Sequence, residues 1–397
     1  MISDTATASL EAIHIENIRK ALEGKEAAIQ NASYETGLLG LSLFYCYYAG
    51  YTGDESYFSR AEDYLTKGLE VLDLPNFKRI YMSDSLDSHL AHIGRFLEFS
   101  KKNKFLDLDI YDYLLGLDDT LSGLMKSKIS IGDFDLNSGA LAAGYYYLSR
   151  LDSNPAVAAH LSALVEGIRE QALTDEAGDY YWPSPSLFKR VYLGISHGSA
   201  LIISFLSNVY ERNIATNECR DILNKALRFL LKQQRTQVRG LFPLQLGDAV
   251  EPKQFAQCYG DIGVGYALYR AASVLHDEAL AGTAMMVLED CLLRKKEDKL
   301  TLDASIIYGA SGVAAIFEKL HRLSGDQRFM DAAIYWYKQI ATYAVHENEF
   351  AGYSTRLVNA GELWDISFGW GITGIGISLM RYVKKELPPI DSLMMIA

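Results

Sequence analysis

The chain has 397 residues, and its 50 acidic residues outnumber its 38 Lys and Arg residues, which gives a net charge of −12 at pH 7. Hydrophobic residues make up 49% and charged residues 22%, a balance that excludes a disordered chain and predicts a large core. The sequence shows no cluster of basic residues, no uninterrupted apolar run of about 20 residues and no signal peptide, so we expect a cytoplasmic protein that binds neither nucleic acid nor membrane.

A glycine-rich signature recurs seven times along the chain. In order, it reads GLLGLS from Gly37, HLAHIG from His89, GALAAG from Gly139, GSALII from Gly198, GDIGVG from Gly260, GASGVA from Gly309 and GITGIG from Gly371. Successive signatures begin 49 to 62 residues apart, which is the length of one helical hairpin with its loops. The sequence therefore predicts seven helical-hairpin repeats.

The two helices expected in each repeat differ in their hydrophobic pattern. The stretch after each signature is too apolar for a surface helix, whereas the segments between signatures, such as 58–72, 217–233 and 325–344, have an apolar stripe at helical spacing. This alternation predicts an all-α fold, a double-layered α/α toroid with inner and outer rings of helices, as a single domain over residues 1–397. An open superhelical solenoid built from the same helix pairs is the alternative.

Three long loops, at about 174–193, 236–257 and 346–367, precede the fourth, fifth and seventh signatures. Strand signals are scarce, although residues 236–257 are expected to hold a short hairpin. Because all three loops lead to the starts of inner helices, we expect them to contact the substrate.

Two chemically active side chains lie within two residues before a signature. Cys258, in QCYGDIGVG, lies near a helix N-terminus, where the helix dipole favours a thiolate; the alternative is a small buried hydrophobic residue. His197, in YLGISHGSA, is a candidate general acid or base near neutral pH. The alternative for His197 is a structural histidine bonded to a neighbouring carbonyl.

Three further residues are candidates for the same site. His89 and His92 are three residues apart, so they lie on one helix face with a spacing that suits a metal ion if a third ligand is near. Asp135 lies four residues before Gly139, where it either caps the helix or orients His197 or binds substrate.

With His197-Gly198, Cys258-Tyr259-Gly260 and the C-terminal GITGIG, the chain resembles the lanthionine synthetase C-like family from Thr36 to Tyr382. The resemblance implies an α/α toroid. It also implies a relation to cyclases that add peptide cysteines to dehydroalanine or dehydrobutyrine and so form thioether rings. In the family, one zinc is held by a Cys from a Trp-Cys-Tyr-Gly motif and by a Cys-His-Gly motif, and a histidine and an aspartate handle protons.

The residue-by-residue match to the family's motifs is partial. Cys258 and Tyr259 match the first zinc motif, with Gln257 in place of its tryptophan, and His197 and Asp135 match the proton-handling pair. The second zinc motif is replaced by Ile307-Tyr308-Gly309. Because catalytic zinc needs about three protein ligands, the prediction is a protein without a cofactor that binds a peptide, such as a ribosomal precursor, or a partner modification enzyme at the toroid mouth.

Two other functions remain open, and so does whether the chain is an enzyme. In one, His89 and His92 join Cys258 to rebuild a zinc site for an active cyclase. In the other, two carboxylates such as Asp135 and Asp261 serve a toroid glycoside hydrolase.

If chemistry remains at this site, we expect His197 to be its acid or base and Asp135 to position His197. Tyr259 then supplies a hydrogen bond to an enolate. We expect Tyr308 to take the former metal position, with its hydroxyl near His197 or Cys258.

Overall fold

A computed structural model describes residues 9–29, 31–73, 85–235, 240–248, 254–355 and 362–397. Contacts between Cα atoms divide the chain into two compact units. The first unit contains Met1–Lys78, Leu302–Ala314 and Asp331–Pro389, and the second contains Arg79–Thr301, Ala315–Met330 and Ile390–Ala397. The expectation of a single domain therefore stays a prediction.

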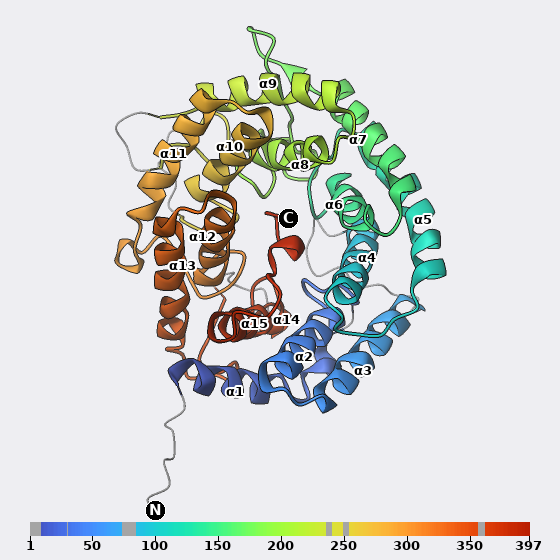
Figure 1. Ribbon diagram of the computed structural model, residues 1–397, viewed down its shortest axis with the longest axis vertical. Helices are drawn as coiled ribbons and strands as arrows, with labels where there is room; N and C mark the ends of the chain where they lie inside the picture. The colour runs from blue at the N-terminus through green and yellow to red at the C-terminus, as the bar shows by residue number, and fades with distance from the viewer. Residues whose placement is uncertain (1–8, 30, 74–84, 236–239, 249–253, 356–361) are drawn as a thin grey trace, which may run out of the picture. The chain divides into compact units, whose positions relative to one another are not determined.

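The second unit is built from four consecutive helical hairpins. They are α4 (Leu86–Lys102) with α5 (Tyr111–Ser130), α6 (Leu141–Arg150) with α7 (Ala158–Glu170), α8 (Ser199–Glu211) with α9 (Thr216–Lys232), and α10 (Asp261–Leu275) with α11 (Glu278–Leu292). Within this unit the first helices lie side by side as an inner layer and the second helices cover them (Figure 1). The inner helices are apolar and buried on nearly all sides, yet no helix in the described ranges is long and apolar enough to cross a membrane.

Glycine at the start of an inner helix lets the preceding loop fold back against it. At Gly198, which caps α8, an added Cβ atom would lie 2.2 Å from the backbone of Tyr192. At Gly260, which caps α10, φ is +110° and an added Cβ atom would lie 2.7 Å from the carbonyl oxygen of Gln254. Both positions therefore require glycine, which explains why the signature recurs at helix starts.

The first unit repeats the alternation of buried and amphipathic helices. It contains α1 (Leu10–Leu22), α2 (Leu38–Thr52), α3 (Ser56–Glu70), the short α14 (Glu362–Ile366) and α15 (Ile372–Val383). In this unit α1 packs on α15, α15 on α2, and α2 on α3. Helices α12 (Ala310–Ser324) and α13 (Gln327–Ile340) have residues in both units. The predicted amphipathic segments coincide with α3, α9 and α13, which confirms them as helices.

Short 3₁₀ turns flank several helices: η1 (Lys25–Ala28), η2 (Val71–Asp73), η3 (Pro155–Val157), η4 (Lys296–Asp298), η5 (Ala341–Tyr343) and η6 (Asp391–Leu393). The one sheet among the described residues is a two-stranded antiparallel hairpin of β1 (Leu173–Thr174) and β2 (Tyr180–Tyr181), in the first of the three long loops.

The prediction of a hairpin in 236–257 is wrong for the part that the structure describes, residues 240–248 and 254–257. That part forms one isolated bridge, between Gln245 and Tyr192, and no strand. The reason is that the backbone N–H groups of Leu241 and Phe242 donate to the side chain of Asp261 instead of to a strand. Residues 236–239 and 249–253 lie outside the described part of the chain.

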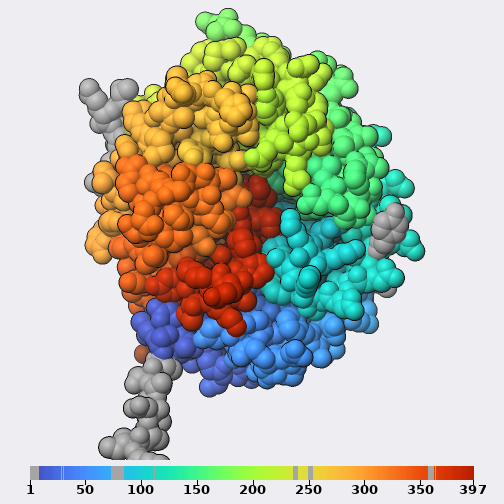
Figure 2. All heavy atoms as spheres, in the orientation of Figure 1, coloured from blue at the N-terminus to red at the C-terminus, as the bar shows by residue number. Residues whose placement is uncertain are grey.

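Residues 390–397 lie against the inner layer of the second unit. Arg95 of α4 donates to the carbonyl oxygen of Ser392 at 2.7 Å, and the hydroxyl of Tyr266 in α10 donates to that of Ile396 at 2.9 Å. Ile396 is fully buried, and the dark red atoms of this segment lie beside the cyan surface of α4 in Figure 2. The segment thus supplies apolar contacts to helices that are too hydrophobic to face water.

Candidate functional site

The centre of the site is a buried pair formed by His197 and Asp135. Nδ1 of His197 lies 2.5 Å from Oδ2 of Asp135, and the two side chains are 10% and 0% exposed. Asp135 lies in the loop before α6, and His197 directly precedes Gly198 at the start of α8. The structure therefore brings together two predicted site residues that are 62 positions apart in sequence.

The loop before α6 holds Asp135 through local side-chain to backbone bonds. Oδ1 of Asp135 accepts from the backbone N–H of Asn137 at 2.8 Å, and the N–H of Asp135 donates to Oδ1 of Asp133 at 3.1 Å. Such Asx turns fix a short loop without regular structure. Burial raises the pKa of Asp133, whose carboxylate also accepts from Ser138. Asp135 thus caps its loop through one oxygen and contacts His197 through the other.

Two tyrosines flank the imidazole of His197. The ring of Tyr192 lies edge-on to it, with centroids 5.9 Å apart, and the ring of Tyr259 lies at 6.4 Å, tilted by 48°. Tyr259 is a predicted site residue. The sequence analysis missed Tyr192 because it belongs to no motif. The one observation that points to it is the close packing of Gly198, at the start of α8, against the Tyr192 backbone.

Cys258 lies in the loop that leads into α10, beside the loop that carries His197. Its side chain is buried, and its carbonyl oxygen accepts from Oγ of Ser196 at 3.1 Å. This bond ties the residue before His197 to the residue before Tyr259. Ser196, too, was missed by the sequence analysis.

The other three cysteines behave as small buried hydrophobic residues. Burial raises the pKa of Cys46 and Cys291 well above that of an exposed thiol, and it raises the pKa of Cys219 to about 12.

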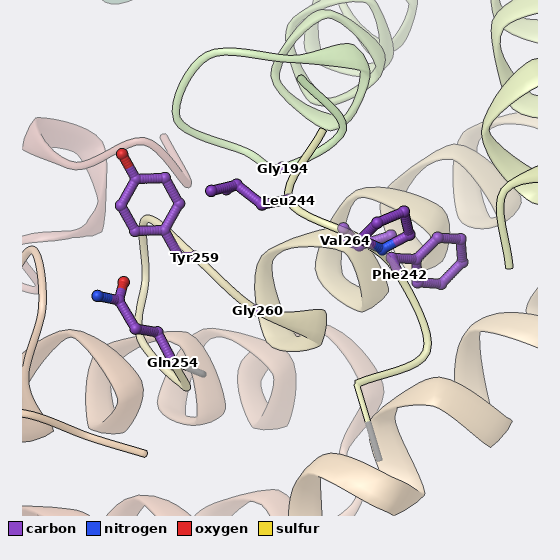
Figure 3. A pocket seen from close by; sticks show the side chains of 8 residues that line it. Gly194, Phe242, Leu244, Gln254, Tyr259, Gly260 and Val264 are labelled. Carbon is purple, nitrogen blue, oxygen red and sulfur yellow. The ribbon is translucent and has the colours of Figure 1, made fainter. Parts of the chain in front are cut away.

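A pocket of about 280 Å³ opens beside Tyr259. Its lining is Gly194, Phe242, Pro243, Leu244, Gln254, Tyr259, Gly260 and Val264. Phe242 and Val264 lie together at one end, and Tyr259 and Gln254 lie at the other (Figure 3).

The carboxylate of Asp261, the first residue of α10, holds the Phe242 wall of this pocket. It accepts from the N–H groups of Leu241 and Phe242 at 2.9 and 3.0 Å, and burial raises its pKa. Both oxygens of Asp261 thus accept from backbone N–H groups, so this carboxylate anchors the loop.

His89 and His92 lie in the first turns of α4, both buried. Nδ1 of His89 is 3.0 Å from the carbonyl oxygen of Ser85, within its own helix start, and burial lowers the pKa of His92 well below the usual value. No group of three or more His, Cys, Asp or Glu side chains in the described part of the chain is placed to hold a metal ion. This geometry lends no support to a metal site rebuilt from His89, His92 and Cys258, and that hypothesis stays a prediction.

Ile307 and Tyr308, which the sequence analysis matches to the position of the family's second zinc motif, belong to the first unit, and that match stays a prediction. The N–H of Ile307 donates to the carbonyl oxygen of Gly369 at 3.0 Å, and the N–H of Tyr308 donates to Oγ of Ser305 at 3.1 Å. The alkyl side chain of Ile307 has no ligand atom, so these residues do not fit the family's zinc. The expected contact of Tyr308 with His197 or Cys258 stays a prediction.

The fold and the site together define an all-α protein with a buried His-Asp pair at the starts of its inner helices. A family model for "Lanthionine synthetase C-like protein" matches residues 28–395, so the chain belongs to the lanthionine synthetase C-like family.

Comparison with solved structures supports the same fold. The match to "Nisin cyclase" has 16% sequence identity and a TM-score of 0.70 and covers 95% of this chain and 93% of that one. This likeness confirms the predicted α/α toroid fold class. A sugar epimerase from a ruminal bacterium matches with 12% identity and a TM-score of 0.38, over 94% of this chain and 99% of that one. No curated protein matches this chain.

Proposed function

We propose that this chain binds a peptide of the lanthipeptide type at the face that carries His197, and that it does so without a zinc ion. The observation that carries the proposal is the intact His197–Asp135 pair. The sequence match that sets Ile307-Tyr308-Gly309 against the family's Cys-His-Gly motif supports binding without zinc. Membership of the family and the likeness to nisin cyclase support a peptide as the bound molecule.

Binding is tested with a labelled peptide that contains one dehydroalanine and one cysteine, measured by fluorescence anisotropy in buffer with a chelator. We expect saturable binding that the chelator leaves unchanged. We also expect His197→Ala to weaken it, by about fivefold for one lost hydrogen bond at the site.

His276→Asn is a matched control, because it removes an exposed histidine at the end of α10 and asparagine accepts the left-handed conformation that His276 adopts. This variant should bind like the parent. Metal analysis of the purified chain is the second readout. Stoichiometric zinc that disappears in Cys258→Ala would contradict the zinc-free proposal.

The close His-Asp contact favours a second candidate function, thioether formation by acid-base chemistry alone. Asp135 holds Nδ1 of His197 and leaves Nε2 to take the proton of a peptide thiol. The sulfur then bonds to Cβ of the dehydroalanine, and the π electrons move to the α-carbon and its carbonyl, where Tyr259 hydrogen-bonds the enolate. His197 returns the proton to Cα, so no other reactant is needed.

This reaction is followed by the loss of the peptide's free thiol, which is read by maleimide labelling and mass spectrometry in the presence of a chelator. We expect His197→Ala to slow it by about 100-fold or more. Peptide binding without any loss of thiol would reject the second candidate and leave the first standing.

A further inference from the structure

The pocket beside Tyr259 is open and mostly apolar, although it adjoins a polar site. Phe242, Leu244 and Val264 form its apolar wall, and its volume of about 280 Å³ lies just below the range for small-molecule sites. A space of this size suits one large aliphatic or aromatic side chain, not a whole ligand.

One polar group in this pocket lacks a partner. The Oε1 atom of Gln254 is buried, and among the described residues it accepts no hydrogen bond. A buried acceptor without a donor carries a desolvation cost, which a ligand with an N–H group removes. The peptide backbone has such a group beside every side chain.

Backbone hydrogen bonds hold the wall of the pocket, which lies beside the His-Asp pair. The N–H of Leu193 donates to the carbonyl oxygen of Leu244 at 3.1 Å, and the N–H of Leu246 donates to the carbonyl oxygen of Val191 at 2.8 Å. The loop that carries His197 therefore also holds the pocket wall. The Tyr259 ring, which lines the pocket, lies 6.4 Å from the His197 ring. An extended peptide advances about 3.3 Å per residue, so a side chain in the pocket belongs one or two residues from the residue at His197.

We infer that this pocket is a specificity subsite for a large apolar side chain of the bound peptide, whose backbone N–H donates to Gln254. The inference rests on the proposed peptide-binding function and adds the class of side chain that the peptide must present. It makes Leu244 and Gln254 specificity-determining residues, neither of which belongs to the His-Asp pair.

The pocket is tested first without any peptide. The probes are N-acetyl-leucine methylamide and N-acetyl-alanine methylamide, titrated into the full-length chain and followed by NMR. We expect the leucine compound to bind at least about tenfold more tightly, and Gln254→Ala to weaken both compounds by about fivefold. His276→Asn, at a residue that does not line this pocket, should leave both affinities unchanged.

Leu244→Trp tests the location, because the larger side chain fills the pocket and should abolish the preference for leucine. The matched control is Leu246→Trp, the same change at an exposed position two residues away that does not line the pocket; it should keep the preference.

The outcomes separate the two proposals. Equal affinity for the two compounds, no binding of either, or a preference that survives Leu244→Trp would overturn the subsite. A leucine preference without binding of the labelled dehydroalanine peptide would overturn the proposed function and leave a site for apolar side chains.

Discussion

A buried ion-pair network joins the first three helices of the second unit, and removing its arginine should destabilise the fold strongly. The Arg150 side chain is 2% exposed; its Nη1 lies 2.9 Å from Oε1 of Glu98, and its Nε lies 3.3 Å from Oδ2 of Asp118. These three residues come from α6, α4 and α5. Arg150→Met keeps much of the aliphatic volume but leaves two buried carboxylates without their cation.

The expected loss in the free energy of unfolding depends on the hydrogen-bond donors that each carboxylate keeps. Breaking a buried ion pair by removing one partner costs about 3–5 kcal/mol. Asp118 still accepts from the hydroxyl of Tyr146 at 2.5 Å, and Glu98 still accepts from Oγ of Ser153 at 2.5 Å. Because each anion keeps a donor, we expect a loss near the lower end of that range, about 3 kcal/mol.

The assay is urea unfolding of the full-length chain followed by far-UV circular dichroism, with hydrogen exchange to locate the loss in α4, α5 and α6. Arg169→Met is the matched control, because Arg169 pairs with Glu166 at 3.4 Å on the surface, where the side chains are 43% and 61% exposed. An exposed pair contributes about 0–1 kcal/mol, so this control should unfold almost like the parent.

A triple variant completes the test of the network. Combining Arg150→Met with Glu98→Gln and Asp118→Asn removes the buried charges, so it should recover much of the lost stability. A loss in Arg150→Met no larger than in Arg169→Met would refute the reasoning, because it would show that the network contributes nothing beyond a surface pair.

Three further predictions concern the site and its surroundings. A double-mutant cycle on His197 and Asp135, measured by urea unfolding, should give a coupling of about 1.5–3 kcal/mol, as expected for a buried charge-assisted bond, and a value below about 0.5 kcal/mol would contradict the pair. Lys189→Gly should stabilise the chain by about 0.5–1 kcal/mol on thermal or urea unfolding, because Lys189 has a positive φ of 54° in a loop tip; destabilisation would count against that backbone conformation. The thiols with raised pKa should stay protonated at pH 8 and resist iodoacetamide in the native chain, which peptide mass spectrometry checks; rapid native labelling would contradict their burial. These thiols are Cys46, Cys219 and Cys291.

The helices were predictable because their signals are local. The signature glycines mark the starts of inner helices, and at Gly198 and Gly260 close backbone approach explains the residue type. The absence of strands in the described part of 236–257 was not predictable from local signals, since Asp261, beyond that segment, accepts from the N–H groups of Leu241 and Phe242. A side chain that competes for backbone donors overrides strand propensity, and nothing in the segment itself reveals the competitor.

The site was predictable only where a residue adjoins a signature. His197 and Asp135 could be paired because both precede inner helices of adjacent repeats, and the structure places them in contact. Ser196 and Gln254 carry no such mark. Ser196 matters because its hydroxyl donates to the carbonyl oxygen of Cys258. Gln254 matters because its buried Oε1 atom accepts no hydrogen bond from the described residues.

The residues that hold the His-Asp pair all lie in one unit. His197, Asp135, Cys258 and the pocket all belong to the second unit, and the hydrogen bonds that hold them also lie within it. Ile307 belongs to the first unit, where its backbone N–H donates to the carbonyl oxygen of Gly369. A backbone bond does not depend on the side chain, so an isoleucine satisfies it as well as a cysteine would. The hydrogen bonds of the His-Asp pair use no atom of Ile307, so the proposed peptide binding at His197 needs no zinc to hold that pair in place.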